Sequence, residues 1–123
     1  MVKKKVLIID DDPNIGELTK VLLESSNYQV LSAGNAAEGI KKARSKKPNL
    51  IILDIMMPEV DGINVCRKLK ADKKTKDIPV IMLTVKWLAD DKKKSLEAGA
   101  CCYMTKPFDN KELARKVTEF IRG

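Results

Sequence analysis

Three carboxylates follow two apolar segments that have the pattern of buried β-strands. Residues 6–9 are aliphatic and lead into Asp10 and Asp11, and the aliphatic residues 50–53 lead into Asp54. Parallel strands end at the same edge of a sheet, so we expect these carboxylates to lie together. Two carboxylates about 4 Å apart repel by roughly 4 kcal/mol at an effective dielectric constant near 20. Such a cluster needs a cation or raised pKa values, and its oxygen ligands favour Mg²⁺, or Mn²⁺, with phosphate oxygens completing the coordination.

Two other predicted strand ends carry groups that suit the same chemistry. Thr84 follows the apolar residues 80–83, and Lys106 follows a fifth predicted strand. A carboxylate such as Asp54 is a known nucleophile toward phosphoryl groups. A hydroxyl donates to a phosphoryl oxygen, and an ammonium group offsets the charge that develops there. Each residue alone is more simply read as a cap or a surface residue, but together they indicate a site that handles a phosphoryl group.

Short apolar strands alternate with amphipathic helices along the whole chain. The predicted strands are 5–9, 28–32, 50–53, 79–83 and 100–104, and the predicted helices are 13–26, 36–46, 63–71, 88–98 and 110–121. This alternation predicts an α/β fold in which helices cover both faces of a parallel sheet. Sites in such sheets form beyond the carboxyl ends of the strands, where the acidic residues are expected.

Helix ends and buried helix faces are also marked in the sequence. Asp12 followed by Pro13 is typical of a helix start, and Gly99 is typical of a helix end. Apolar residues at helical spacing predict the faces that pack on the sheet. These residues are Leu18, Val21 and Leu22 in the first helix, and Leu113, Val117, Phe120 and Ile121 in the last.

Length and composition predict one domain, residues 1–123, with no output domain in this chain. The apolar runs are far shorter than a membrane span and the start of the chain does not resemble a signal peptide, so we expect a cytoplasmic protein without membrane contact. Three cysteines without a histidine make neither a disulfide framework nor a usual zinc site. We therefore interpret Cys66, Cys101 and Cys102 as small buried hydrophobic residues, with a redox switch at the adjacent pair as the alternative.

The net charge of +7 comes mainly from lysines that occur in clusters. The clusters are Lys3 to Lys5, Lys41-Lys42, Lys46-Lys47, Lys73-Lys74-Lys76 and Lys92 to Lys94. A basic chain is a signal for nucleic acid binding. Here the clusters are spread over several predicted elements, aromatic residues make up only 4%, and no recognition-helix pattern is present. The sequence therefore predicts solvated lysine faces and no direct nucleic acid binding.

Four strings together resemble the receiver domain of two-component response regulators, over essentially the whole chain. They are VLIIDDDP at 6–13, DIMMPEVDG at 54–62, IMLT at 81–84 and TKPF at 105–108. The resemblance implies a flavodoxin-like, three-layer fold: a five-stranded parallel sheet of order 2-1-3-4-5 with five helices. It also implies a phosphorylation-activated signalling switch, which is no enzyme beyond its own phosphotransfer and slow autodephosphorylation.

The same resemblance implies roles for individual residues. Asp54 corresponds to the phosphoacceptor, which takes the phosphoryl group from a phosphohistidine of a sensor histidine kinase or a histidine phosphotransfer protein. Asp10, Asp11 and Asp54 correspond to the metal-binding acids, and the backbone carbonyl of Met56 to a further ligand of Mg²⁺. Lys106 corresponds to the lysine that contacts the phosphate. The chain has no histidine, so the donor must be another molecule.

The resemblance further implies an output mechanism. Thr84 and Tyr103 correspond to the switch hydroxyl and the switch aromatic, and a downstream protein is expected on the face made by the fourth helix, last strand and fifth helix. Val85 stands where the family usually has a small residue, so it is expected to narrow access to the site. As partner-docking residues the sequence suggests Ile15, Pro107, Phe108 and Trp87.

Two alternatives remain open at this stage. A small haloacid-dehalogenase-like phosphatase would use Asp10 as its nucleophile, and Asp10-x-Asp12 fits its motif loosely, but Pro13 and the short chain argue against it. A flavodoxin-like carrier of FMN is disfavoured because the acidic first loop would repel the flavin phosphate. Identifying the phosphorylated residue, Asp54 or Asp10, discriminates the switch from the phosphatase.

Overall fold

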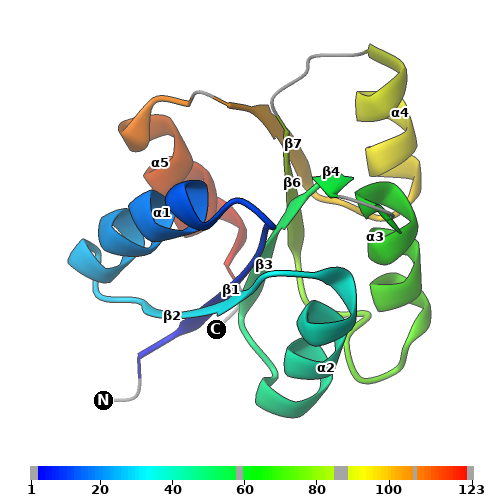
Figure 1. Cartoon of the computed structure of the whole chain (residues 1–123), viewed down its shortest axis with the longest axis horizontal. Coiled ribbons are helices and arrows are strands. Elements are labelled where there is room, and N and C mark those ends of the chain that lie inside the picture. The colour runs from blue at the N-terminus through cyan, green and yellow to red at the C-terminus, as the bar shows by residue number, and fades with distance from the viewer. Residues whose placement is uncertain (1–2, 58–59, 85–88, 107, 122–123) are drawn as a thin grey trace.

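A five-stranded parallel sheet forms the centre of the computed structural model, which describes residues 3–57, 60–84, 89–106 and 108–121 (Figure 1). The strand order is β2-β1-β3-β6-β7, and all four pairings are parallel. The strands are β1 (Lys5–Ile9), β2 (Gln29–Ala33), β3 (Leu50–Asp54), β6 (Val80–Thr84) and β7 (Cys102–Thr105). The two-residue strands β4 (Met56–Met57) and β5 (Val60–Asp61) form a separate antiparallel pair. Because β6 and β7 are the fourth and fifth strands of the main sheet in chain order, this sheet has the predicted order 2-1-3-4-5. The flavodoxin-like fold is confirmed.

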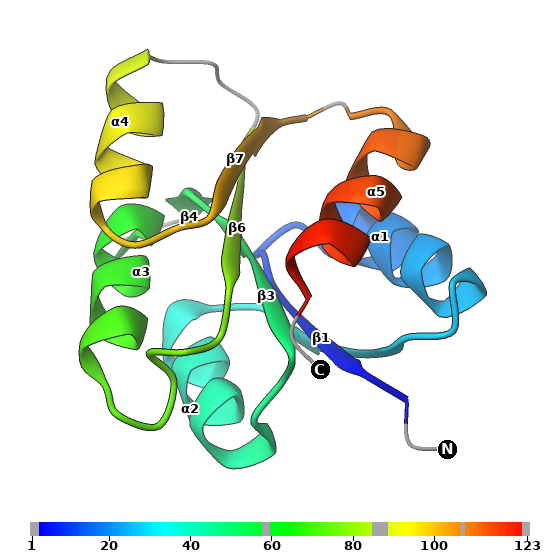
Figure 2. The same cartoon turned by 180° about the vertical axis from the view of Figure 1, so that it is seen from behind.

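Helices cover both faces of this sheet, which gives three layers (Figures 1 and 2). One face carries α1 (Pro13–Ser25) and α5 (Asn110–Phe120). The other carries α2 (Ala36–Lys46), α3 (Gly62–Ala71) and α4 (Ala89–Glu97). None of the helices in the described part of the chain combines the length and the apolar character that crossing a bilayer requires.

Alternate strand residues build one hydrophobic core on each side of the sheet. In β1, Leu7 and Ile9 belong to the core under α2, α3 and α4, whereas Val6 and Ile8 belong to the core under α1 and α5. Both faces of the central strands are covered, which explains why their sequences are apolar without alternation. The resulting rigid sheet fixes where each strand ends, and therefore where the acidic residues lie.

The predicted buried face of α1 is wrong at Leu18 and Val21 and confirmed at Leu22. Leu18 and Val21 are 68% and 59% exposed, whereas Leu23 is completely buried. The helix packs through Thr19, Leu22 and Leu23, which also have helical spacing, so the apolar pattern was shifted by about one residue. In α5, by contrast, Leu113 and Val117 are buried and Phe120 and Ile121 pack against the same core, as predicted.

The predicted helix ends are confirmed by hydrogen bonds. The Asp12 carboxylate accepts from the backbone N–H of Asn14 at the start of α1. Gly99 follows α4 with φ 105°, a left-handed conformation that glycine adopts without strain. The backbone N–H of the next residue, Ala100, donates to the carbonyl of Ser95 and closes this helix end.

Candidate functional site

The register of the central strands brings the predicted acidic residues together. Ile9 of β1 pairs with Leu53 of β3, so the residues that follow them, Asp10 and Asp54, lie side by side. One carboxylate oxygen each of Asp10, Asp11 and Asp54 lie within 4.8 Å of one another. Asp10 and Asp54 are only 8% and 5% exposed, whereas Asp11 is exposed. The cluster thus has a buried floor and one solvent-facing acid.

Lys106 provides the buried cation of this cluster. Its Nζ lies 2.8 Å from Oδ2 of Asp10 and 3.8 Å from Oδ2 of Asp54. The Lys106 backbone N–H donates to the carbonyl of Thr84 at 2.6 Å, which ties the end of β7 to the end of β6. The sequence predicted Lys106 at the site, but it did not predict the direct pair with Asp10, because that pair depends on how the ends of β1 and β7 face each other across β3 and β6.

Backbone groups orient the two buried carboxylates. Oδ1 of Asp10 accepts from the backbone N–H of Asp12 at 2.9 Å, and Oδ1 of Asp54 accepts from the backbone N–H of Met56 at 3.1 Å. In each carboxylate, Oδ1 is therefore held by the loop that follows the strand, while Oδ2 faces Lys106. The side chains are positioned by backbone atoms of the strand ends themselves.

The electrostatics of the cluster favour a bound cation. The pKa of Asp54 is raised to about 6, chiefly by burial. Lys106 and the Met56 N–H lower this pKa, while the negative charges of Asp10 and Asp11 add to the rise. One lysine does not neutralise three carboxylates. Several carboxylate oxygens in one place are the donor set of a hard divalent ion, so these residues could hold a metal.

Thr84 and Tyr103 lie on neighbouring strands and on the same face of the sheet. Thr84 ends β6 and pairs with Thr105, while Tyr103 pairs with Met82 two residues earlier. Because strand side chains alternate with period two, Thr84 and Tyr103 project from one face. Both are buried, with exposed fractions of 1% and 8%. The structure therefore places the two predicted switch residues on one face of neighbouring strands, with Thr84 at the end of the strand that pairs with the Asp54 strand.

The predicted docking residues are only partly described. Phe108 is partly buried and packs against the core under α1 and α5. Its contacts therefore indicate a packing role. Pro107, Trp87 and the side chain of Ile15 lie outside the described residues. Val85, expected to narrow the site, lies outside them as well.

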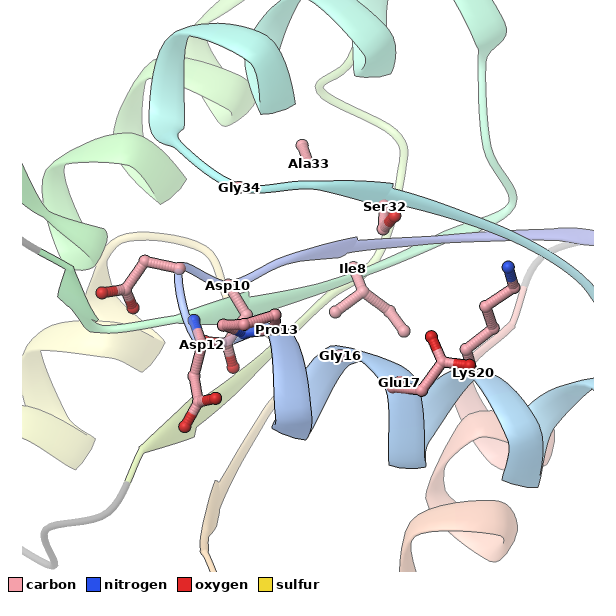
Figure 3. Close-up of a pocket in the computed structure, with 11 residues that line it drawn as sticks. Ile8, Asp10, Asp12, Pro13, Gly16, Glu17, Lys20, Ser32, Ala33 and Gly34 are labelled. Carbon is pink, nitrogen blue, oxygen red and sulfur yellow. The ribbon is translucent and has the colours of Figure 1, made fainter.

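A pocket of about 270 Å³ adjoins the acidic cluster between the start of α1 and the end of β2 (Figure 3). Asp10, Asp11 and Asp12 line it on one side, and Ser32 and Gly34 line it on the other. Glu17 and Lys20 of α1 extend the polar lining away from the cluster (Figure 3). The pocket therefore reaches Asp10 and Asp11 from the α1 side, while Asp54 and Lys106 are not part of its lining.

Gly62 is a supporting residue that the sequence reasoning did not single out. A Cβ at this position would lie 2.6 Å from the Cα of Ile55 and still closer to the backbone carbonyl oxygen of Asp54. The Gly62 N–H also donates to the carbonyl of Ile55 at 2.9 Å. The start of α3 thus packs directly on the backbone of the strand end that carries Asp54. A glycine immediately after the helix-capping Asp61 was the available signal.

The three cysteines behave as core residues. All are free; Cys66 is buried, while Cys101 and Cys102 are partly buried. The last two pack against the core under α1 and α5. Burial raises the pKa of the Cys101 thiol to about 11, which disfavours the reactive thiolate.

Sequence comparison decides the family. The sequence model of the response regulator receiver domain matches residues 6–118. The chain belongs to this family. As a receiver domain, it is a phosphoacceptor switch of two-component signalling, which agrees with the acids, hydroxyl and lysine at its strand ends and favours this reading over a phosphatase.

Curated relatives of this receiver domain are signalling proteins about twice its length. It is 43% identical over 121 residues to the alkaline phosphatase synthesis transcriptional regulatory protein PhoP of Bacillus subtilis, covering 98% of this chain and 50% of that protein. It is also 43% identical over 118 residues to the DNA-binding dual master transcriptional regulator RpaA of Synechocystis, covering 96% of this chain and 49% of that protein. The chain therefore spans about half the length of these relatives.

Solved structures agree with this assignment. The Vibrio cholerae chemotaxis protein CheY4 superimposes with a TM-score of 0.92 at 26% identity, covering 98% of this chain and all of that one. A CheY-like receiver domain protein of Methanospirillum hungatei superimposes with a TM-score of 0.90 at 33% identity, covering 96% and 93% of the two chains. The receiver fold is thus matched over nearly the whole chain.

Proposed function

We propose that Asp54 is the phosphoacceptor of this receiver domain. The observation that carries the proposal is the position of Asp54: a buried carboxylate beside Asp10 and Asp11, with its Oδ2 facing Lys106. A carboxylate oxygen of Asp54 attacks the phosphorus of a phosphohistidine. The P–N bond breaks, the imidazole leaves with the bonding electron pair, and an acyl phosphate forms on Asp54. Water later attacks the same phosphorus and regenerates the carboxylate, so the protein catalyses only its own turnover.

The other residues of the cluster prepare this transfer. The Met56 N–H holds Oδ1 of Asp54 and so fixes the direction in which the nucleophile points. Lys106 offsets the charge of the incoming phosphoryl oxygens, and the hydroxyl of Thr84 is placed at the next strand end to donate to one of them. Raising the pKa of Asp54 toward neutrality makes its carboxylate a stronger nucleophile while leaving it mainly ionised at pH 7.

We propose Mg²⁺, or Mn²⁺, as the metal ion of the acidic cluster. Asp10, Asp11 and Asp54 supply carboxylate oxygens, and the backbone carbonyl of Met56 is proposed as a further ligand. When bound, the ion supplies positive charge that neutralises the phosphoryl oxygens and lowers the repulsion among the acids. The chain's own contribution is to hold these acids in place before the ion and the donor arrive.

The proposed output is a change of the face formed by α4, β7 and α5. A phosphoryl group adds roughly −1.5 to −2 units of charge and three acceptor oxygens. Thr84 moves to bond one oxygen, which frees space on its face of the sheet for Tyr103, two residues along the neighbouring strand. Tyr103 then biases an existing equilibrium between two arrangements of that face.

The proposed partners follow from the same scheme. The phosphoryl donor is a sensor histidine kinase or a histidine phosphotransfer protein, docking near Ile15, Pro107 and Phe108. The target contacts the α4–β7–α5 face, with Trp87 as a proposed anchor. The similar proteins PhoP and RpaA are transcriptional regulators, which supports a target in transcription. A cytoplasmic location, as the sequence predicted, belongs to this proposal.

Labelling with a phosphoryl donor tests the proposal. We expect a small acyl or carbamoyl phosphate, or a phosphorylated kinase, to label the wild-type protein in the presence of Mg²⁺. EDTA should abolish the label because the acids then repel the donor, and Asp54→Asn should abolish it because the amide is not a nucleophile. Mass spectrometry of the labelled peptide identifies the site. Stoichiometric labelling of the Asp54→Asn variant, or a label on Asp10, would overturn the assignment.

A further inference from the structure

The loops at the carboxyl ends of the parallel strands and those at their amino ends carry opposite charge; we call these two sides the carboxyl edge and the amino edge of the sheet. Within the described residues, the strand ends and loops at the carboxyl edge hold one lysine, Lys106, against six acids: Asp10, Asp11, Asp12, Asp54, Asp61 and Asp109. The loops at the amino edge hold two acids, Asp72 and Asp77, against six lysines: Lys3, Lys4, Lys47, Lys73, Lys74 and Lys76. We call these six lysines, with Lys46 at the end of α2, the basic end. It lies opposite the phosphoacceptor site.

Contacts between elements bring the lysine clusters of the basic end together. Lys5 Nζ donates to the carbonyl of Lys46 at 2.8 Å, which joins the first cluster to the end of α2. Arg44 of α2 pairs with Asp72 at 3.0 Å, which joins α2 to the loop that carries the third cluster. Lys74 of that loop lines one groove of about 400 Å³ with Arg44 and Lys41. Clusters that are scattered in the sequence therefore form one surface.

The basic end is a row across the middle of the sheet. Its three clusters lie just before β1, β3 and β6, and these three strands are neighbours in the sheet. Adjacent strands lie about 4.8 Å apart, so the lysine loops succeed one another along a line. A linear row of cations matches a rod-shaped polyanion better than it matches a flat one.

The charge of the basic end is available to a ligand. All seven lysines are exposed, and none of them forms an ion pair with a carboxylate in the described part of the chain. Asp72, one of the two nearby acids, is already occupied by Arg44 and by the backbone N–H of Lys74. The positive charge is therefore not neutralised within the molecule.

The composition of the basic end fits phosphates and not a protein surface. Protein interfaces centre on apolar and aromatic anchors. The large apolar side chains that are exposed in the described residues are on α1, on α4 and next to the acidic site: Leu18, Val21, Leu96 and Met56. Lysine is a flexible point charge that contacts phosphates without the fixed geometry of base recognition.

From these observations we infer that the basic end binds the phosphate backbone of double-stranded DNA without sequence preference. The inference departs from the expectation from the sequence, which rested on the scatter of the lysine clusters, the few aromatic residues and the lack of a recognition-helix pattern. It goes beyond the phosphoacceptor switch and does not depend on it, since the two sites occupy opposite edges of the sheet. Its energy comes from counterion release, so it must weaken steeply with salt.

Salt-dependent binding to a duplex tests this inference. Fluorescence anisotropy of a labelled duplex of scrambled sequence is measured at several KCl concentrations, with a second, unrelated duplex for comparison. The logarithm of the association constant should fall linearly with the logarithm of salt, with a slope of about −0.9 per neutralised phosphate. Both duplexes should bind equally. Absence of binding at the lowest salt, or a strong preference for one duplex, would overturn the inference.

Matched charge variants locate the surface. The test variant combines Lys73→Gln, Lys74→Gln and Lys76→Gln, because the hydrogen bonds of this loop use backbone atoms that glutamine retains. The control variant removes the same charge from α4 and α5 through Lys93→Gln, Lys94→Gln and Lys111→Gln. For the test variant, we expect the slope of log association constant against log salt to become shallower by about two to three, and the affinity at low salt to fall tenfold or more. The control variant should change little in both quantities. Equal losses in both would mean that net charge alone drives binding, and would overturn the assignment to the basic end.

Two further measurements keep the outcome decisive. Lys3→Gln with Lys4→Gln changes a different segment of the basic end and should lower the slope by about two. Thermal melts and labelling at Asp54 should be unchanged in the variants of the basic end, so that loss of binding is not loss of folding. Binding to vesicles of anionic phospholipid without binding to the duplex would identify a membrane surface instead and would overturn the inference.

Discussion

At the scale of single residues, the site is a balance between three acids and one lysine. Asp54 is buried next to two other carboxylates, and its nearest compensation, Lys106, lies closer to Asp10 than to Asp54. The carboxylate of Asp54 is therefore held in a place that disfavours its charge, which is the origin of its raised pKa. The burial of Asp54 beside two other acids therefore affects both the stability of the folded protein and the reactivity of the Asp54 carboxylate.

Asp54→Asn should stabilise the metal-free protein at pH 7 by about 1 kcal/mol, because it removes a buried charge that its neighbours repel. The pKa of Asp54 is raised to about 6 in the folded protein, above its value in the unfolded chain. The folded state therefore binds the proton more tightly, and the wild type loses stability as the pH rises from about 4 through 6. The gain of the variant should vanish near pH 4. Denaturant unfolding in EDTA across this range measures it, and a gain independent of pH would contradict the assigned cause.

Mg²⁺ should raise the melting temperature of the wild type, since an ion that binds only the folded state stabilises it by about 2.7 kcal/mol at a hundredfold excess over its Kd. Asp11→Asn should weaken this response because one ligand is lost, while raising the metal-free stability by about 1 kcal/mol because repulsion is relieved. Calorimetry with and without Mg²⁺ compares the two proteins. A less stable metal-free variant with unchanged Mg²⁺ affinity would argue against a shared acidic pocket.

At the scale of elements, local signals predicted what local forces decide. The helix caps and the glycine after α4 follow from hydrogen bonds between near neighbours, and the strands follow from local apolar runs; their positions were predicted within two residues. The buried face of α1 was predicted wrongly at Leu18. Leu18 and Thr19 are neighbours in the sequence, and only packing against the sheet decides which of the two is buried. The two-residue strands β4 and β5 are too short to show a period. The Lys106–Asp10 pair joins residues 96 positions apart, beyond any local pattern.

Gly62→Ala tests how closely α3 supports the site. The new Cβ would overlap the backbone of Asp54 and Ile55, which cannot rotate away as a side chain can, so we expect a loss of about 2–3 kcal/mol. Gly16→Ala is the matched control: a Cβ there meets nothing within 4 Å, and a helical alanine should add about 0.5–1 kcal/mol. Chemical denaturation measures both. Similar effects of the two substitutions would show that the contact of Gly62 with the strand end has no energetic weight.

At the scale of the whole molecule, the proposed switch requires the sheet to carry the state of the phosphoacceptor site to the α4–β7–α5 face. Thr84 and Tyr103 belong to the adjacent strands β6 and β7, and α4 follows β6 in the chain. In the proposed mechanism, a change at Thr84 reaches the α4–β7–α5 face through these two neighbouring strands. In this proposal, movement of two side chains, Thr84 and Tyr103, biases the equilibrium between two arrangements of the α4–β7–α5 face.

A beryllofluoride complex of the Mg²⁺-loaded protein should report this coupling. The sequence places Trp87 three residues after Thr84, so its emission should change when the phosphoryl mimic binds. Thr84→Ala should largely remove the change, because the hydroxyl that senses the added oxygens is lost. Steady-state fluorescence titrations compare the two proteins. An identical emission change in the variant would refute the coupling, while leaving phosphorylation at Asp54 intact.

The charge balance of the site is complete only when the whole sheet is assembled. Asp10 and Asp54 are brought together when β1 pairs with β3, whereas Lys106 arrives only when β7, the last strand, joins the sheet. Lys106 reaches Asp10 only when β3 and β6 lie between β1 and β7 in the complete sheet. A partly folded chain that lacks β7 therefore carries an uncompensated acidic cluster and is raised in energy. Because Lys106 compensates the acids only in the complete sheet, partly folded forms are less stable and the folding transition becomes more cooperative.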